Sequence, residues 1–134
     1  MFSLLSALFA ALTAVLAKIG VSNINSNLAT SIRTVVITIF AWSIVFFQKS
    51  FHGLNSLPKH SVLFLILSGL TTGLSWLFYF KALQLGSVSK VVPIDKLSLV
   101  LAVVFGALFL SEKITLNVIF GSVLMTLGAI LIAF

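Results

Sequence analysis

The sequence has little charge and no cysteine. Of its 134 residues only 7% are charged, and Asp95 and Glu112 are the only acids. A soluble domain carries roughly a quarter of its residues as Asp, Glu, Lys or Arg, so this chain cannot coat itself with water-compatible side chains. The absence of cysteine excludes disulfides, thiolate chemistry and cysteine-ligated metal sites.

Catalytic motifs are absent as well. There is no GxxxxGK[ST] phosphate loop, no HExxH zinc motif and no GxSxG nucleophile elbow. We interpret His52 and His60 as residues of one interfacial loop rather than as metal ligands. The sequence therefore predicts a protein that is not an enzyme and that needs no cofactor. Gradients, not ATP bound to this chain, would drive any transport.

The abundant residues are apolar, at 60% of the chain. A bilayer core of about 30 Å needs about 20 apolar residues per helical pass. Barrel strands would alternate polar and apolar residues, whereas these runs are apolar all round. We therefore predict an all-α fold, a polytopic bundle of five transmembrane helices at about 2–19, 28–47, 61–83, 90–110 and 115–134, in a single domain over 1–134.

The first apolar run has a rival interpretation as a signal peptide. Such peptides begin with a basic region, and no Lys or Arg precedes this run, so we favour a retained helix. The later basic residues are scattered singly despite a net charge of +6. That pattern excludes a nucleic-acid partner and fits residues that orient helices and meet anionic lipid headgroups.

Small residues recur at helical spacing in these runs and predict close helix packing. A GxxxG pair lies in the third run, a small-residue stripe in the fourth, and two glycines a heptad apart in the fifth. They are Gly69, Gly73, Ser98, Ala102, Gly106, Gly121 and Gly128. The alternative is that membrane helices are simply rich in such residues.

The charge bias that orients membrane proteins is nearly balanced here. Five passes place Lys49, Lys59 and Lys113 on one side, and Lys18, Lys81 and Lys90 on the other. Such balance permits insertion in both orientations and an antiparallel homodimer. The alternative is that the loop borders differ by a few residues, which would tip the count.

Charged residues inside the spans are the candidate functional residues. An ionisable group at membrane depth costs roughly 2.5–3.5 kcal/mol on insertion scales and is functional by default. Asp95 leads into the Ser98 stripe and should not face its neighbour Lys96, because adjacent helical residues point apart. Arg33, Lys18 and Lys81 are its candidate partners. It serves either as a substrate or proton site, or as half of an ion pair that sets helix register.

Pro93 and two aromatic residues lie near these charges. Proline removes a backbone donor, so Pro93 either breaks the fourth helix beside a cavity, as in transporters, or shapes its first turn. Trp76 and Tyr79 either line a substrate pocket or anchor the helix at the interface.

Several segments together resemble the EamA domain of the drug/metabolite transporter superfamily. Phe78–Ser89 (FYFKALQLGSVS) resembles the exit of its third helix, and Phe109–Ile114 (FLSEKI), which follows Pro93, resembles its "LgEr" corner. Gly121–Gly128 resembles its closing helix. The resemblance extends over most of the chain, and the order and spacing of the motifs make it fairly specific.

The resemblance implies a five-helix half-unit, because many family members carry two such domains in tandem and inverted. It also implies export of amino acids, other metabolites or drugs across the bacterial inner membrane. Two departures stand out: the first helix has no acid like the one that small multidrug transporters use for proton exchange, and Pro93–Lys96 (PIDK) is more charged than the family pattern.

Our leading hypothesis is a homodimeric, gradient-driven transporter of small organic metabolites, with its cavity between the third and fourth helices of both copies. The bilayer, a second copy and a small-molecule substrate are its expected partners. Its candidate residues are Asp95, Lys96, Arg33, Trp76, Tyr79 and Lys18. The alternative is a non-transporting structural or accessory subunit, such as one serving a flippase of lipid-linked sugars.

Dual insertion can be tested with topology reporters fused to each terminus in turn. The balanced lysine count predicts that each reporter is active on both sides of the membrane, because neither orientation is favoured by charge. A single orientation for every molecule would rule out the antiparallel dimer.

Overall fold

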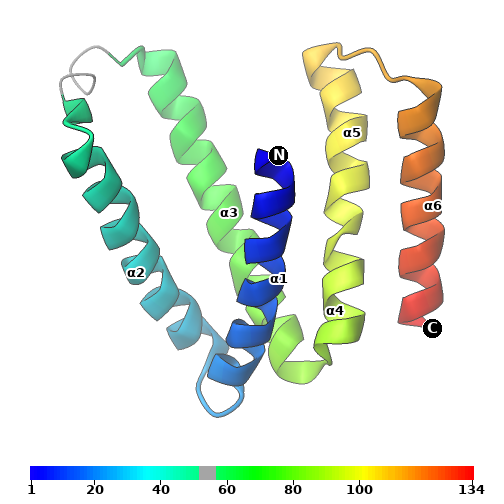
Figure 1. Ribbon diagram of the computed structural model, residues 1–134, viewed down its shortest axis with the longest axis horizontal. Helices are drawn as coiled ribbons and strands as arrows, with labels where there is room; N and C mark the ends of the chain where they lie inside the picture. Colours follow the sequence, from blue (N-terminus) through cyan, green and yellow to red (C-terminus); the bar gives the residue numbers. More distant parts are fainter. Residues whose placement is uncertain (52–56) are drawn as a thin grey trace. The chain divides into compact units, whose positions relative to one another are not determined.

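The computed structural model describes residues 1–51 and 57–134, and this part of the chain is helical and contains no strand. Five stretches are long and apolar enough to cross a membrane, which confirms the predicted fold class. Figure 1 shows the helices. In chain order they are α1 (Phe2–Val21), α2 (Ser26–Phe47), α3 (Lys59–Leu85), α4 (Val88–Asp95), α5 (Leu97–Leu110) and α6 (Leu116–Ala133).

The helix boundaries lie close to the predicted spans, and most helices run about two residues beyond the apolar core. Lys18 lies in the last turn of α1, and Lys59 and His60 begin α3. Polar and charged side chains can extend a membrane helix because their heads reach back to the interface. The prediction that His60 lies in an interfacial loop is thus wrong, whereas His52 lies outside the described residues.

The fourth span, Val88–Leu110, consists of two helices, α4 and α5. Pro93 lies inside α4, and the regular helix is interrupted three residues later, at Lys96. The Leu99 amide donates to the Lys96 carbonyl at 3.0 Å, a tighter turn than the α-helical one. Pro93 itself has no amide proton to offer the preceding turn.

The chain divides into two compact units. The α1–α3 unit is Leu16–Gln84, the end of α1 with α2 and α3, and the α4–α6 unit comprises Met1–Val15 with Leu85–Phe134. In the first, α2 and α3 run in opposite directions, and in the second α6 packs against α4 and α5 (Figure 1).

Two long polar side chains join α1 to α3 within the α1–α3 unit. Lys18 Nζ donates to the Leu83 carbonyl at 2.6 Å. Gln84 Nε2 donates to the Val21 carbonyl at 3.2 Å and to the Ile24 carbonyl at 2.8 Å. The last carbonyls of a helix have no partner inside it, so each helix end supplies the donor that the other lacks.

Beside these hydrogen bonds lies the small apolar core of the unit. Its fully buried side chains are Val21, Phe80 and Leu83, at 1%, 1% and 0% exposure. The α2 residues Ser26, Ala29 and Thr30 are buried as well, and the Asn25 side chain caps α2 by accepting from the Asn27 amide at 2.8 Å. The α1–α2 turn and the end of α3 therefore form the best-packed part of this unit.

A tight corner ends α5 in the α4–α6 unit. Ser111 adopts a left-handed conformation, φ 54° and ψ 32°, and the Glu112 amide donates to the Gly106 carbonyl at 3.2 Å. A Cβ added to Gly106 would lie 3.0 Å from Glu112 Oε2, so the glycine makes room for the returning carboxylate. The Glu112 side chain thus lies against α5.

The Gln84 hydrogen bonds predict a stability effect. Gln84→Leu keeps the size of the side chain but removes the donor to two carbonyls, and we expect a loss of about 1 kcal/mol. Tryptophan fluorescence during thermal unfolding in detergent measures it. Lys81→Gln is the matched control, because Lys81 is exposed and bonds Gln84 Oε1 only at 3.4 Å. An unchanged midpoint for Gln84→Leu would contradict the capping role.

The left-handed conformation of Ser111 predicts that a glycine at this position would stabilise the protein. Ser111→Gly removes a Cβ that a left-handed residue accommodates poorly, and we expect a gain of about 0.5–1 kcal/mol. The same unfolding measurement applies. Ser111→Ala retains the Cβ and should not stabilise the protein. An equal gain for both variants would show that backbone strain is not the cause.

Candidate functional site

The charged centre of the α1–α3 unit is Arg33, which lies on α2 and is half-buried. Its guanidinium carbon lies over two rings of α3, 5.4 Å from the Trp76 centroid and 4.7 Å from the Phe80 centroid. Both distances fall within the range of cation–π attraction. Trp76 and Phe80 are four residues apart and so share a helix face.

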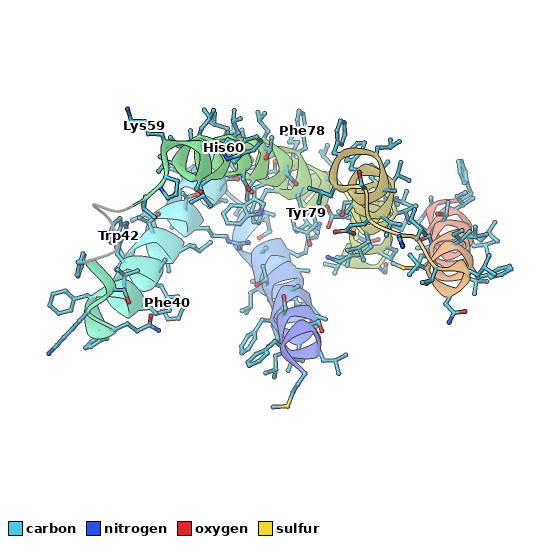
Figure 2. The ribbon with its side chains drawn as sticks, turned by 90° about the horizontal axis from the view of Figure 1, so that it is seen from above. Phe40, Trp42, Lys59, His60, Phe78 and Tyr79 are labelled. Atoms are coloured by element: carbon cyan, nitrogen blue, oxygen red, sulfur yellow. The ribbon has the colours of Figure 1, made fainter. Side chains whose placement is uncertain are left out.

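Tyr79 lies beside this pair on α3, close enough to interact electrostatically with Arg33. Its ring meets that of Phe80 edge to face, with centroids 5.7 Å apart. Figure 2 shows Phe78 and Tyr79 on different sides of α3, and Phe78 is 75% exposed. The structure therefore brings together Arg33, Trp76 and Tyr79, three of the residues that the sequence singled out.

All charged side chains of the α1–α3 unit are positive. Leu16–Gln84 contains no Asp or Glu, and its cations are Lys18, Arg33, Lys49, Lys59 and Lys81. Lys18 is engaged by the Leu83 carbonyl, a contact that the sequence did not predict. Arg33 therefore has π faces around it but no carboxylate within its own unit.

Asp95 and Lys96 lie in the α4–α6 unit, at the interruption between α4 and α5. Lys96 Nζ is 3.7 Å from Asp95 Oδ2. The expectation that these neighbours point apart was wrong, because the interrupted helix and the long lysine side chain let the charges meet. Both side chains remain partly exposed, at 45% for Lys96 and 35% for Asp95, and such pairs contribute about 0–1 kcal/mol. Asp95 thus stays accessible for other chemistry.

Two further polar residues have places that the sequence did not predict. His60 lies in the first turn of α3 with its ring centroid 4.7 Å from that of Phe64. Glu112 lies with its carboxylate against Gly106. No group of three or more potential metal ligands occurs among residues 1–51 and 57–134.

The small residues differ in what surrounds them. Beyond its chain neighbours and the backbone of its own helix, a Cβ added to Gly69, Gly73, Gly121 or Gly128 would meet no described atom within 4 Å, whereas Gly106 packs against Glu112. In α6 the buried residue is Ala129. In the described chain, the glycines of α3 thus lie on an open helix face.

Sequence reasoning missed an aromatic group formed by α2 and Phe51, which follows it. Trp42 stacks on Phe51, with centroids 6.2 Å apart, and Phe46 meets Phe51 edge to face at 6.1 Å. Together with Thr38 and Ser43 they line an open, mostly apolar hollow. Figure 2 shows Phe40 and Trp42 on different sides of α2. The spacing of Trp42 and Phe46, four residues apart, was the available signal.

Comparisons with known proteins agree with the helical architecture. The model of the EamA-like transporter family matches residues 1–134. A protein of Sinorhizobium sp. named "Uncharacterized transporter in cobO 3'region" is 51% identical over 132 residues, which is 98% of this chain and 94% of that protein. No solved structure matches the chain. With both a family model over its whole length and a close relative, the chain belongs to the EamA-like transporter family, part of the drug/metabolite transporter superfamily.

Proposed function

We propose that the protein is a secondary transporter that exports small organic metabolites, amino acids or drugs across the bacterial inner membrane as a homodimer. The observation that carries this proposal is the 51% identity to a relative named as a transporter, which is matched over 94% of its length. That relative is therefore also about one five-helix unit long. Its name states neither a substrate nor a direction.

The proposed homodimer rests on the arrangement that the family resemblance implies. Many members of the family carry two such domains in tandem, and two copies of this five-helix unit would reproduce that arrangement. The open faces of Gly69 and Gly73 on α3 suit the close approach of another helix. The balanced lysine count is compatible with either an antiparallel or a parallel pair.

Asp95 is our candidate for coupling transport to a gradient. It is one of only two acids in the chain. It lies in a membrane span, beside a helix interruption, and is 35% exposed. A carboxylate in such a place can take up and release a proton as the substrate moves. Lys96, at 3.7 Å, would hold the deprotonated form until the proton arrives.

Transport is tested with purified protein in proteoliposomes, using a panel of radiolabelled amino acids and the cationic dye ethidium. We expect an imposed proton gradient to drive the transport of at least one probe by the wild-type protein. Asp95→Asn should lower that flux at least tenfold, equivalent to about 1.4 kcal/mol of barrier, because the side chain can no longer bind and release a proton.

Glu112→Gln removes the other acid and is the matched control, with near wild-type flux expected. Unchanged flux together with a lower unfolding temperature for Asp95→Asn would assign Asp95 a structural role. Absence of flux for every probe, from folded wild-type protein, would favour the accessory-subunit alternative.

A further inference from the structure

Arg33 is held in place by rings but is not neutralised by them. Its guanidinium carbon lies 4.7 Å from the Phe80 centroid and 5.4 Å from that of Trp76. Phe80 is only 1% exposed, so its ring is fixed by packing. Aromatic faces attract the charge but offer no hydrogen-bond acceptor of the kind that five N–H donors require.

No carboxylate is available to Arg33 in the α1–α3 unit. The Arg33 guanidinium makes no hydrogen bond or ion pair to residues 16–51 or 57–84. The unit also contains no Asp or Glu, so this holds for carboxylates whatever rotamers its side chains adopt. The neighbouring Thr30 and Thr34 hydroxyls donate to carbonyls of α2 itself, at 2.9 Å each.

The energetics of this arrangement favour an anionic occupant. An arginine within a membrane span is costly, and its cation–π contacts offset part of that cost without satisfying any of its N–H donors. The planar guanidinium binds carboxylates and other oxyanions through two parallel hydrogen bonds. A fixed guanidinium with open donors is therefore prepared for a planar oxyanion.

We infer that Arg33, Trp76 and Phe80 form a binding site for the oxyanion group of the substrate, and that the transported compounds are organic acids or zwitterions rather than purely cationic drugs. Arg33 would bind the carboxylate, and Trp76 would lie against the apolar body beside it. This inference rests on the proposed transport function and narrows its substrate class.

An anionic lipid headgroup offers the same chemistry from another source. Arg33 lies seven residues into α2, which begins at Ser26, so it is about 10 Å along the helix axis from that end. That depth favours a soluble ligand entering from the aqueous side over a headgroup that stays at the interface.

The two tryptophans of the chain allow a direct binding test. In a Trp42→Phe background Trp76 is the single tryptophan, and its emission reports on the site. The protein, in nanodiscs of zwitterionic lipid, is titrated with 3-phenylpropionate, its neutral amide and the corresponding 3-phenylpropylammonium. We expect a saturable change with the acid and a response at least tenfold weaker with the amide and the amine.

Variants then assign the effect to the guanidinium. Arg33→Gln should weaken binding of the acid at least tenfold, and Arg33→Lys should bind with intermediate affinity, because it keeps the charge but loses the planar pair of donors. Lys59→Gln is the control: it removes one positive charge at the start of α3, 17 residues from Trp76. Unfolding temperatures verify that each variant is folded.

Several results would overturn the inference. They are a Trp76 response that is absent with all three probes, equal binding of acid and amide, or wild-type binding by folded Arg33→Gln. Tighter binding of the acid by Asp95→Asn would show that Arg33 is already paired with Asp95. A change in emission caused by phosphatidylglycerol alone, with competition against the acid, would assign the site to lipid.

Binding and flux separate this inference from the transport proposal. Arg33-dependent binding without flux of any probe in proteoliposomes would refute transport and leave the anion site standing. Flux of amino acids by Arg33→Gln at the wild-type rate would refute the site and leave transport standing.

Discussion

Hydrocarbon around every helix is the constraint on which this structure depends. Without water in the bilayer core, each polar group of a span must find its partner within the protein. The hydroxyls of α2 and α3 meet this demand locally, by donating to carbonyls three or four residues earlier, as Thr30, Thr34 and Thr72 do. The helix ends meet it through one another, since Lys18 and Gln84 cap carbonyls across the α1–α3 unit.

Hydropathy predicted the five spans and the all-α fold because the same apolar runs that exclude water also set the helix positions. It underestimated most helix lengths, because residues such as Lys59 and Gln84 look like loop residues yet continue a helix. Hydropathy could not predict contacts that depend on a particular partner residue. The sequence alone does not show that Gln84 reaches the Ile24 carbonyl, or that Glu112 turns back onto Gly106 rather than pairing with Lys113.

The conformation of the corner after α5 explains one residue of the family pattern. The "LgEr" pattern that Phe109–Ile114 resembles has a glycine where this chain has Ser111. The left-handed φ of 54° at Ser111 explains the glycine, because only glycine adopts that conformation without a steric cost. The corner keeps its hydrogen bond from Glu112 to Gly106 despite the substitution, so the turn is determined by more than one residue.

Charge is divided unequally along the chain, and this division bears on mechanism. Both acids, Asp95 and Glu112, belong to the α4–α6 unit, whereas five of the eight cations belong to the α1–α3 unit. The sequence singled out Arg33 for its depth and offered it, with Lys18 and Lys81, as a candidate partner of Asp95. Within its own unit, Arg33 lies against two rings and Asp95 lies beside Lys96.

A cation held on rings and an acid held by a lysine can respond to different ligands. An organic anion would satisfy the donors of Arg33, while a proton would neutralise Asp95 and release Lys96. If both events occur in one transport cycle, substrate recognition and coupling are carried by separate groups, unlike a single carboxylate that must bind the substrate and the proton in turn. Such a division would account for the absence of an acid in α1 and for the charge of the Pro93–Lys96 segment.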